Sequence, residues 1–226
     1  MDDPVFRNTL HVFDNRAHAG ELLAHKLEEY GGKEDVYILA IPAGGVQVAL
    51  PIAIQLDAPL DLAITRKIHV PWNSEVGFGA ISWEGVMFLN EPLIASLGLT
   101  REEIDRCIVA EKAVIARRLK MFRGDKPFPD LKDQTAIIVD DGLASGFSML
   151  ATLETLGRLG AKAKIVAVPT APVSAVNLIR PFAEKIVCLN LRSGPFFAVA
   201  DAYKRWYDLD EGDVLDALQS LKSESS

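Results

Sequence analysis

The chain has 226 residues, of which 49% are hydrophobic and 24% charged, and its formal net charge at pH 7 is −7. This composition is typical of a globular protein with a sizeable core in one large domain, and the acidic balance argues against a nonspecific nucleic-acid surface. The N-terminus lacks a signal-peptide pattern, and no apolar run approaches the roughly 18–20 residues of a membrane span. We therefore expect a cytoplasmic protein with no membrane partner, in which Cys107 and Cys188 are reduced thiols.

The first third of the chain is predicted to alternate between helix and strand. The expected order is helix, strand, helix and strand, at residues 13–32, 36–41, 46–56 and 59–67. Asp14 is the expected cap of the first helix and Gly31 its end, while Pro51 is expected to kink or shorten the second helix.

The middle of the chain is predicted to hold a flexible loop and then a long helix. Residues 67–89 alternate irregularly and include several breakers, so we interpret them as a mobile loop that continues into a hairpin around 83–85. Thr100 and Glu103 form a capping box that opens a helix over 100–124. The charged and apolar sides of this helix are typical of packing or of an oligomer surface.

The last part returns to alternating strands and helices. Strands are predicted at 135–140, 164–169 and 185–190, with helices at 146–160 and 174–184. This alternation indicates an α/β fold with a mostly parallel central sheet flanked by helices. We expect one domain over 1–210, followed by a C-terminal helix and frayed tail over 211–226.

The chemistry is expected at two strand ends, because ligands bind at the carboxyl edge of an open parallel sheet. One strand ends in Asp140 and Asp141, followed by a loop of small, hydroxylic and glycine residues, and another strand ends in the sequence IPAGG. Carboxylates accept hydrogen bonds from hydroxyl groups or attract Mg²⁺, and glycine-rich turns before helices present N–H groups to phosphate. The pattern predicts a receptor for a sugar phosphate.

These residues also resemble a known family. IIVDDGLASGFS is similar to the phosphoribosyl-diphosphate-binding signature of the type I phosphoribosyltransferases, and the closest likeness is to a group of predicted members whose acceptor is unassigned. IPAGGVQVA resembles the diphosphate loop of that group, and LDLAITRKIHVPWNSEVGFGAI resembles its flexible loop. The resemblance covers about residues 7–208 and implies the family fold with a small hood, usually in a homodimer or larger homo-oligomer.

The resemblance also implies a role for each matching position. Asp140 and Asp141 would bind the ribose hydroxyls, with Mg²⁺ as the cofactor close to them. The 5′-phosphate would be held by five loop residues: Ala144, Ser145, Gly146, Phe147 and Ser148. The diphosphate would be wrapped by three residues, where family members often carry a non-proline cis peptide: Ala43, Gly44 and Gly45. Arg66 and Lys67 would neutralise the departing diphosphate, which a nucleobase-like nitrogen acceptor displaces from C1 of the ribose.

This sequence departs from the family pattern at three places. Ser145 and Ser148 stand where threonine is commoner, and Ala43 stands where this group usually has arginine. Ala144 stands where the enzymes that accept hypoxanthine or guanine carry an acid. An acid that contacts the base must then come from elsewhere, and we propose Glu75, on the predicted flexible loop, as the general acid or base.

The acceptor itself is not defined by the sequence. Phe196 or Phe197 is a candidate to stack on the acceptor base, although either could instead fill the edge of the core. Trp72 and Trp83 could close over the substrate or simply pack.

Four other interpretations compete with this one. The repeat of His11, His18 and His25 lacks further metal ligands at helical spacing and favours a solvated face. A receiver domain requires a later phosphoacceptor aspartate that these strand ends do not supply. A phosphatase or hydrolase of sugar phosphates lacks a nucleophile beside the acids. The alternative that stays open is a non-catalytic sensor of phosphoribosyl diphosphate, which the missing cation at position 43 favours.

Overall fold

The computed structural model describes residues 3–224, apart from the side chains of residues 74, 75 and 222–224. Its centre is a five-stranded sheet in the order β2-β1-β6-β7-β8 in which every neighbouring pair is parallel. The strands are β1 (Val36–Ala40), β2 (Leu60–Leu62), β6 (Thr135–Val139), β7 (Ala163–Pro172) and β8 (Lys185–Arg192). Strand order reverses between β1 and β6, so the helices that follow these two strands lie on opposite faces of the sheet, and ligands commonly bind at the carboxyl ends of such strands.

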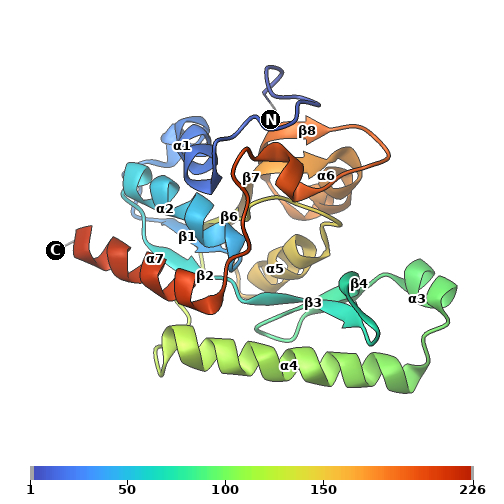
Figure 1. Cartoon of the computed structure of the whole chain (residues 1–226). Helices are drawn as coiled ribbons and strands as arrows, with labels where there is room; N and C mark the ends of the chain where they lie inside the picture. Colours follow the sequence, from blue (N-terminus) through green and yellow to red (C-terminus); the bar gives the residue numbers. More distant parts are fainter. Residues whose placement is uncertain (1–2, 225–226) are drawn as a thin grey trace.

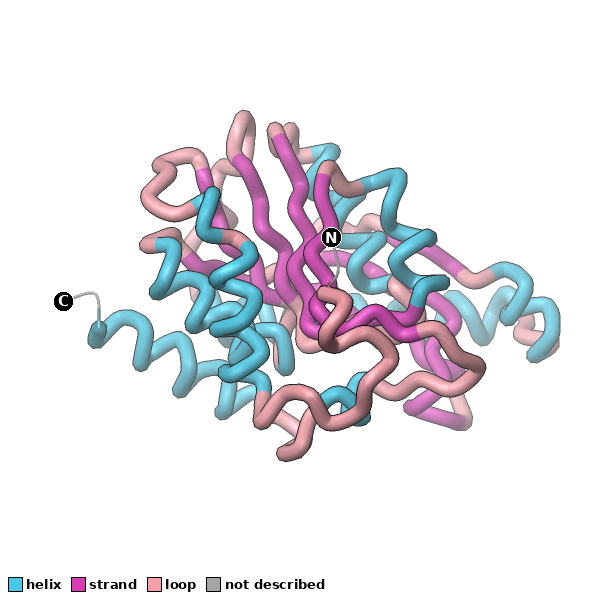
Figure 2. Tube along the Cα trace, turned by 90° about the horizontal axis from the view of Figure 1, so that it is seen from above, coloured by secondary structure: helices cyan, strands magenta, loops and turns pink. Residues whose placement is uncertain are grey.

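Helices cover both faces of this sheet, as the view from above shows (Figure 2). Those on one face are α1 (Arg16–Lys26), α2 (Gly44–Leu56) and α7 (Glu211–Glu224), and those on the other are α5 (Phe147–Arg158) and α6 (Val173–Ile179). Three short 3-10 turns complete the connections, at Glu28–Tyr30, Arg180–Phe182 and Val199–Ala202.

The strands of the central sheet send alternate side chains into two separate cores. In β1, Ile38 and Ala40 join the core under α1 and α2, whereas Leu39 faces the core under α5. In β6, Ile137 joins the core under α1 and α2, and Ile138 joins the core under α5. Burial on both faces explains why these strands are almost continuously apolar in sequence. The α/β fold class with a parallel sheet flanked by helices is confirmed.

A second, antiparallel sheet lies between the central domain and a long helix (Figure 1). It consists of β3 (Thr65–Val70), β4 (Asn73–Ser82) and β5 (Met87–Leu89), and it is followed by α3 (Glu91–Leu97) and α4 (Arg101–Arg123). The predicted capping box of α4 is confirmed: Thr100 Oγ1 accepts from Glu103 N, and Thr100 N donates to the Glu103 carboxylate.

Hydroxyl groups tie the antiparallel sheet to the helix α5. The Thr65 and Thr152 hydroxyls lie 2.9 Å apart, and Thr155 Oγ1 donates to Ser82 Oγ at 2.7 Å. All four side chains are buried. These paired buried hydroxyls fix β3 and β4 relative to α5, because leaving them unpaired would cost the desolvation of each group.

The structure differs from the predicted elements in several details. The helix predicted over 13–32 begins at Arg16 with Asn15 as its cap, because the Asp14 carboxylate instead accepts from Lys204 Nζ at 2.8 Å. It ends at Lys26, before a 3-10 turn. The strand predicted over 59–67 is divided between β2 and β3, which belong to different sheets. Pro51 does not shorten α2, and α3 has no counterpart among the predicted elements.

The mobile loop predicted over 67–89 is mostly strand in the structure, its hairpin at 83–85 is present, and its mobility stays a prediction. It forms most of the antiparallel sheet. Glycine in β4 weakens the alternating pattern but allows close packing: a Cβ atom at Gly79 would lie 2.5 Å from Phe88 O of β5. Register shifts on either side of His69 break the regular pattern further.

None of the helices in the part of the chain that the structure describes has the length and apolar character needed to cross a bilayer.

Candidate active site

A cleft of about 400 Å³ opens at the carboxyl ends of β1 and β6, at the switch point of the central sheet. Residues 41–44 after β1 and residues 140–146, 148 and 149 after β6 line it. Thr65, Arg66, Lys67 and His69 of β3 line another part, and Val199 and Trp206 come from the C-terminal segment. The two strand ends singled out in the sequence therefore meet in one cleft.

The loop after β1 lies directly against the end of β6. A cis peptide bond joins Pro42 to Ala43, at the position where the family resemblance implied one. A Cβ atom on Gly44 would overlap the Asp141 carboxylate, and one on Gly45 would lie 2.7 Å from Val139 O. Glycine is required at both positions because no side chain fits between the two loops. Of the three predicted diphosphate-binding residues, Ala43 and Gly44 line the cleft.

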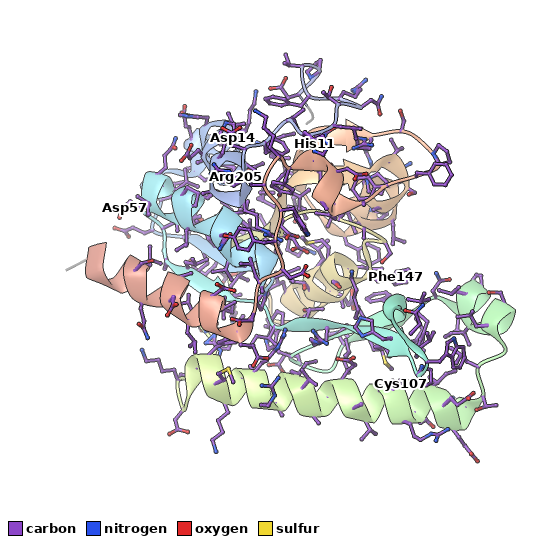
Figure 3. The ribbon with its side chains drawn as sticks, viewed as in Figure 1. His11, Asp14, Asp57, Cys107, Phe147 and Arg205 are labelled. Carbon is purple, nitrogen blue, oxygen red and sulfur yellow. The ribbon has the colours of Figure 1, made fainter. Side chains whose placement is uncertain are left out.

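The loop after β6 presents the start of α5 to the cleft. Gly146, the N-cap residue of α5, has a φ of 84°, a conformation that favours glycine. In the described structure no side chain caps this end of the helix. The first N–H groups of an α-helix have no partner within the helix, so this end of α5 offers donors to an anion. Ala144, Ser145 and Ser148 line the cleft beside Gly146. Phe147 is the first residue of α5 and does not belong to the described lining (Figure 3).

Asp140 and Asp141 are adjacent acids in a partly enclosed site. Burial and the neighbouring charge of Asp141 raise the pKa of Asp140 well above its ordinary value, and the Lys67 ammonium opposes this shift. Burial also raises the pKa of Asp141, although the Arg16 guanidinium acts in the opposite direction. Two acids held in this environment favour a ligand that brings hydroxyl donors or positive charge.

Arg16 holds Asp141 in place and was not identified from the sequence. Its Nε donates to Asp141 Oδ2 at 2.8 Å, and a second guanidinium nitrogen donates to Tyr207 O at 3.0 Å. The guanidinium lies 3.9 Å from the centre of the Trp206 ring, and the arginine side chain is only 4% exposed. Asp141 is therefore fixed by an ion pair. Asp140 has no ion-pair partner among the described residues.

The two ends of the domain meet beside this ion pair. His11, Asp14 and Arg205 lie close together where the N-terminal segment runs along the C-terminal segment (Figure 3). Arg205 N donates to Asp14 O at 3.1 Å, and Phe13 pairs with Tyr203 in a parallel bridge. Tyr203 Oη in turn donates to Asp141 O at 2.6 Å. This pairing brings Arg16, Tyr203 and Trp206 to the acids.

The β3 side of the cleft carries three nitrogen-containing side chains. Arg66 Nε donates to Glu111 Oε2 at 2.9 Å, and His69 Nδ1 lies 3.0 Å from Glu111 Oε1. Two cationic side chains, Arg66 and Lys67, belong to the described cleft lining, and no ion pair with a described residue is present for Lys67. The predicted pair Arg66 and Lys67 therefore faces the cleft, and of the two only Lys67 has no ion-pair partner among the described residues.

The remaining predicted residues lie elsewhere. The side chain of Glu75 falls outside the described part of the chain, so its role stays a prediction. Phe196 is 88% exposed, and the described lining contains neither Phe196 nor Phe197. Trp83 stacks on Phe128 at 4.8 Å between ring centres, which is a packing role. Sequence analysis did not identify three residues of the site: Arg16, His69 and Glu111. In the sequence, each is simply an ionisable residue on a helix or strand, and nothing else marks it.

Comparison with known proteins decides the family. Residues 9–177 match the family model described as "Phosphoribosyl transferase domain". The chain belongs to this phosphoribosyltransferase family. A Mycobacterium tuberculosis (strain H37Rv) protein, whose name assigns it provisionally to the phosphoribosyl transferases, is 34% identical over 204 residues. That match covers 90% of this chain and 46% of the relative, so the chain spans about half the length of the curated relatives it matches.

Two solved structures share the fold of this chain. The protein TT1426 from Thermus thermophilus is 31% identical, with a TM-score of 0.72 over 92% of this chain and 98% of that chain. The AQ2163 protein from Aquifex aeolicus, at 11% identity and a TM-score of 0.52, covers 79% of this chain and 75% of that chain and shows the fold alone.

Proposed function

We propose that this phosphoribosyltransferase-family chain transfers the 5-phosphoribosyl group from phosphoribosyl diphosphate to a nucleobase-like nitrogen acceptor. The observation that carries the proposal is the arrangement at the end of β6. Two acids stand directly before the uncapped start of α5, in the cleft at the switch point of the sheet. A ribose 5-phosphate fits this arrangement chemically, because its hydroxyls are donors for the acids and its phosphate is an acceptor for the helix N–H groups.

Each part of the cleft has a distinct role in the proposed reaction. Asp140 and Asp141 hold the ribose hydroxyls, and residues 144–148 hold the 5′-phosphate. Residues 43–45 bind the diphosphate, whose charge Lys67 and Arg66 offset. As the bond between C1 and the diphosphate oxygen breaks, its electrons stay on the diphosphate and the acceptor nitrogen attacks C1. Fixed charges in a site that excludes water stabilise the positively charged ribosyl centre of the transition state.

Mg²⁺ is the proposed cofactor. No cluster of three or more His, Cys, Asp or Glu side chains that could hold a metal occurs among the described residues. This donor set fits Mg²⁺ that arrives with the substrate, because Mg²⁺ commonly takes one or two carboxylates together with substrate phosphates and waters. Asp140 would contact it, directly or through water, and the ion would neutralise the diphosphate.

Glu75 stays the proposed general acid or base for the acceptor. Glu75→Gln is expected to reduce turnover far more than substrate binding, and an unaltered rate would remove this role. The cytoplasmic location and the homo-oligomeric state also stay predictions.

A sensor of phosphoribosyl diphosphate is the second candidate. Two observations favour it: position 43 is alanine, and Arg66 is already paired with Glu111. Both reduce the positive charge available to a departing diphosphate. A sensor and a transferase share the same binding step, so only release of diphosphate separates them.

Calorimetric titration with phosphoribosyl diphosphate, with and without Mg²⁺, tests the shared step, and diphosphate release with a panel of nucleobases tests the transferase. The site variant is Asp140→Asn, and the matched control is Asp105→Asn, an exposed acid on α4. We expect Mg²⁺-dependent binding that Asp140→Asn weakens and the control leaves intact. Binding without release from any base would favour the sensor, and absence of binding would refute both functions.

A further inference from the structure

His69 and Glu111 form a carboxylate–imidazole pair at the edge of the cleft. The His69 Nδ1 atom lies 3.0 Å from Glu111 Oε1, and the two side chains are 22% and 12% exposed. His69 lines the cleft together with its strand neighbours Arg66 and Lys67. Nδ1 is therefore committed to Glu111, and Nε2 is the ring nitrogen left to interact with a ligand.

The pairing of β3 with β4 is irregular at His69. The register with β4 shifts between Ile68 and His69 and again between His69 and Val70, and His69 is paired with Gly77. Irregularities of this kind change the direction of a side chain and are frequent beside active sites. The extra residues of both shifts lie in β4, so regular pairing with this strand is interrupted on either side of His69, at the part of β3 that lines the cleft.

Glu111 is held in its ionised form. Burial raises its pKa, but the hydrogen bonds from His69 and Arg66 outweigh burial, so that the pKa of Glu111 lies below its ordinary value. An ionised carboxylate at this place accepts from Nδ1–H and so fixes the orientation of the ring. The charged groups around His69 are Arg66 and Lys67 on β3 and Glu111 on α4, and the residue opposite on β4 is Gly77.

We propose that His69 is a catalytic residue that donates a proton to the departing diphosphate, and that Glu111 is the positioning residue that holds its ring. This inference rests on the proposed transfer reaction. When the C1–O bond breaks, the electron pair remains on the diphosphate oxygen, and the Nε2 proton of the imidazolium moves to the diphosphate. The acceptor nitrogen releases its own proton to solvent as the N–C1 bond forms, and His69 regains a proton from solvent, so no net proton is left on the enzyme.

The diphosphate side of the cleft is the appropriate place for this step. His69 belongs to the same strand as Arg66 and Lys67, which supply the positive charge. Since Arg66 is paired with Glu111, and position 43 contributes no cation, a proton from His69 would add to the neutralisation that Lys67 and Mg²⁺ are proposed to supply. Histidine changes its protonation near physiological pH and is suited to this role.

The chain provides a matched control pair. His25 Nδ1 lies 3.0 Å from Glu28 Oε1 as well, but these side chains are 63% and 65% exposed and lie outside the cleft lining. The variants are His69→Asn, His69→Gly, Glu111→Gln and the control His25→Asn. The assay is diphosphate release from phosphoribosyl diphosphate and Mg²⁺, with the base that the nucleobase panel identifies, or with water as acceptor where no base reacts.

We expect His69→Asn to lower kcat about 100-fold or more, as is common for loss of a general acid. The Kd of phosphoribosyl diphosphate, measured by calorimetry, should change little because the proton moves only in the transition state. Added imidazole should restore release by His69→Gly, since the space beside Glu111 admits the free ring. The same imidazole should fail to restore the double variant His69→Gly, Glu111→Gln, because its orientation is then lost.

Three results would overturn the inference. If the wild type releases diphosphate and His69→Asn does so at the same rate, like His25→Asn, His69 has no catalytic role and the proposed function stands. A slow His69→Gly variant that binds the substrate but gains nothing from imidazole would also refute proton donation. No release by the wild type would refute the transferase together with this inference.

Discussion

Removal of Arg16 is the sharpest test of how the acid pair is held. In Arg16→Met the buried Asp141 keeps its place but loses the hydrogen bond at 2.8 Å and the opposing charge. Breaking one side of a buried ion pair costs about 3–5 kcal/mol. In a chain of this length, each kcal/mol lost from the free energy of unfolding lowers Tm by about 2–4 °C, so the expected fall in Tm is about 6–20 °C.

The loss should depend on pH in a defined direction. Without Arg16, burial raises the pKa of Asp141 further above its unfolded value, so the ionised form destabilises the folded state. The stability of Arg16→Met is then retained at low pH and lost as pH rises through the folded pKa of Asp141. The difference in Tm from the wild type is therefore expected to be largest at neutral pH and to shrink as the solution is acidified.

Thermal unfolding of Arg16→Met, Asp141→Asn and the double variant, followed by circular dichroism at neutral and acidic pH, measures these effects. The double variant should regain much of the stability that Arg16→Met loses, because no buried charge remains unpaired. A Tm for Arg16→Met close to that of the wild type at neutral pH would refute the reasoning. Strictly additive losses in the double variant would contradict a direct pairing.

Three further predictions concern the same cleft. Gly44→Ala should unfold at a lower temperature and lose binding of phosphoribosyl diphosphate, because the new methyl group overlaps the Asp141 carboxylate. The control Gly157→Ala on α5 has room for its methyl group and should retain both the unfolding temperature and the binding. Asp140→Asn should raise Tm at neutral pH, since the raised pKa of Asp140 makes its ionised form destabilising; the gain should vanish below the unfolded pKa of about 3.9. Lys67→Gln should lower the affinity for phosphoribosyl diphosphate, measured by calorimetry, about 10- to 100-fold, which is the effect of losing a hydrogen bond to a charged group. An unchanged affinity would contradict the placement of Lys67 on the diphosphate side.

Local signals predicted the elements whose formation depends on neighbouring residues. The capping box at Thr100 and Glu103 predicted the start of α4, and the apolar run before Asp140 predicted β6. The meeting of the two loops followed from topology, since parallel strands end at one edge of the sheet.

The parts that the sequence did not reveal depend on distant contacts. Arg16 resembles any charged residue on a surface helix, and its partner Asp141 lies 125 positions later in the chain. Glu111 has the same appearance on α4, although it pairs with His69 from a separate sheet. The antiparallel sheet escaped prediction because glycine and two register shifts interrupt the alternation by which strands are recognised.

The bridge between Phe13 and Tyr203 has a consequence for biosynthesis. The acid pair is encoded near the middle of the chain, but the groups that fix it come from positions on either side, at Arg16 and Tyr203. On the ribosome, the central strands can pair while the last of these groups has yet to emerge. The arrangement of the acid pair is therefore completed late, when the C-terminal segment docks, and in a nascent chain lacking that segment the Asp141 carbonyl oxygen has no Tyr203 hydroxyl to accept from.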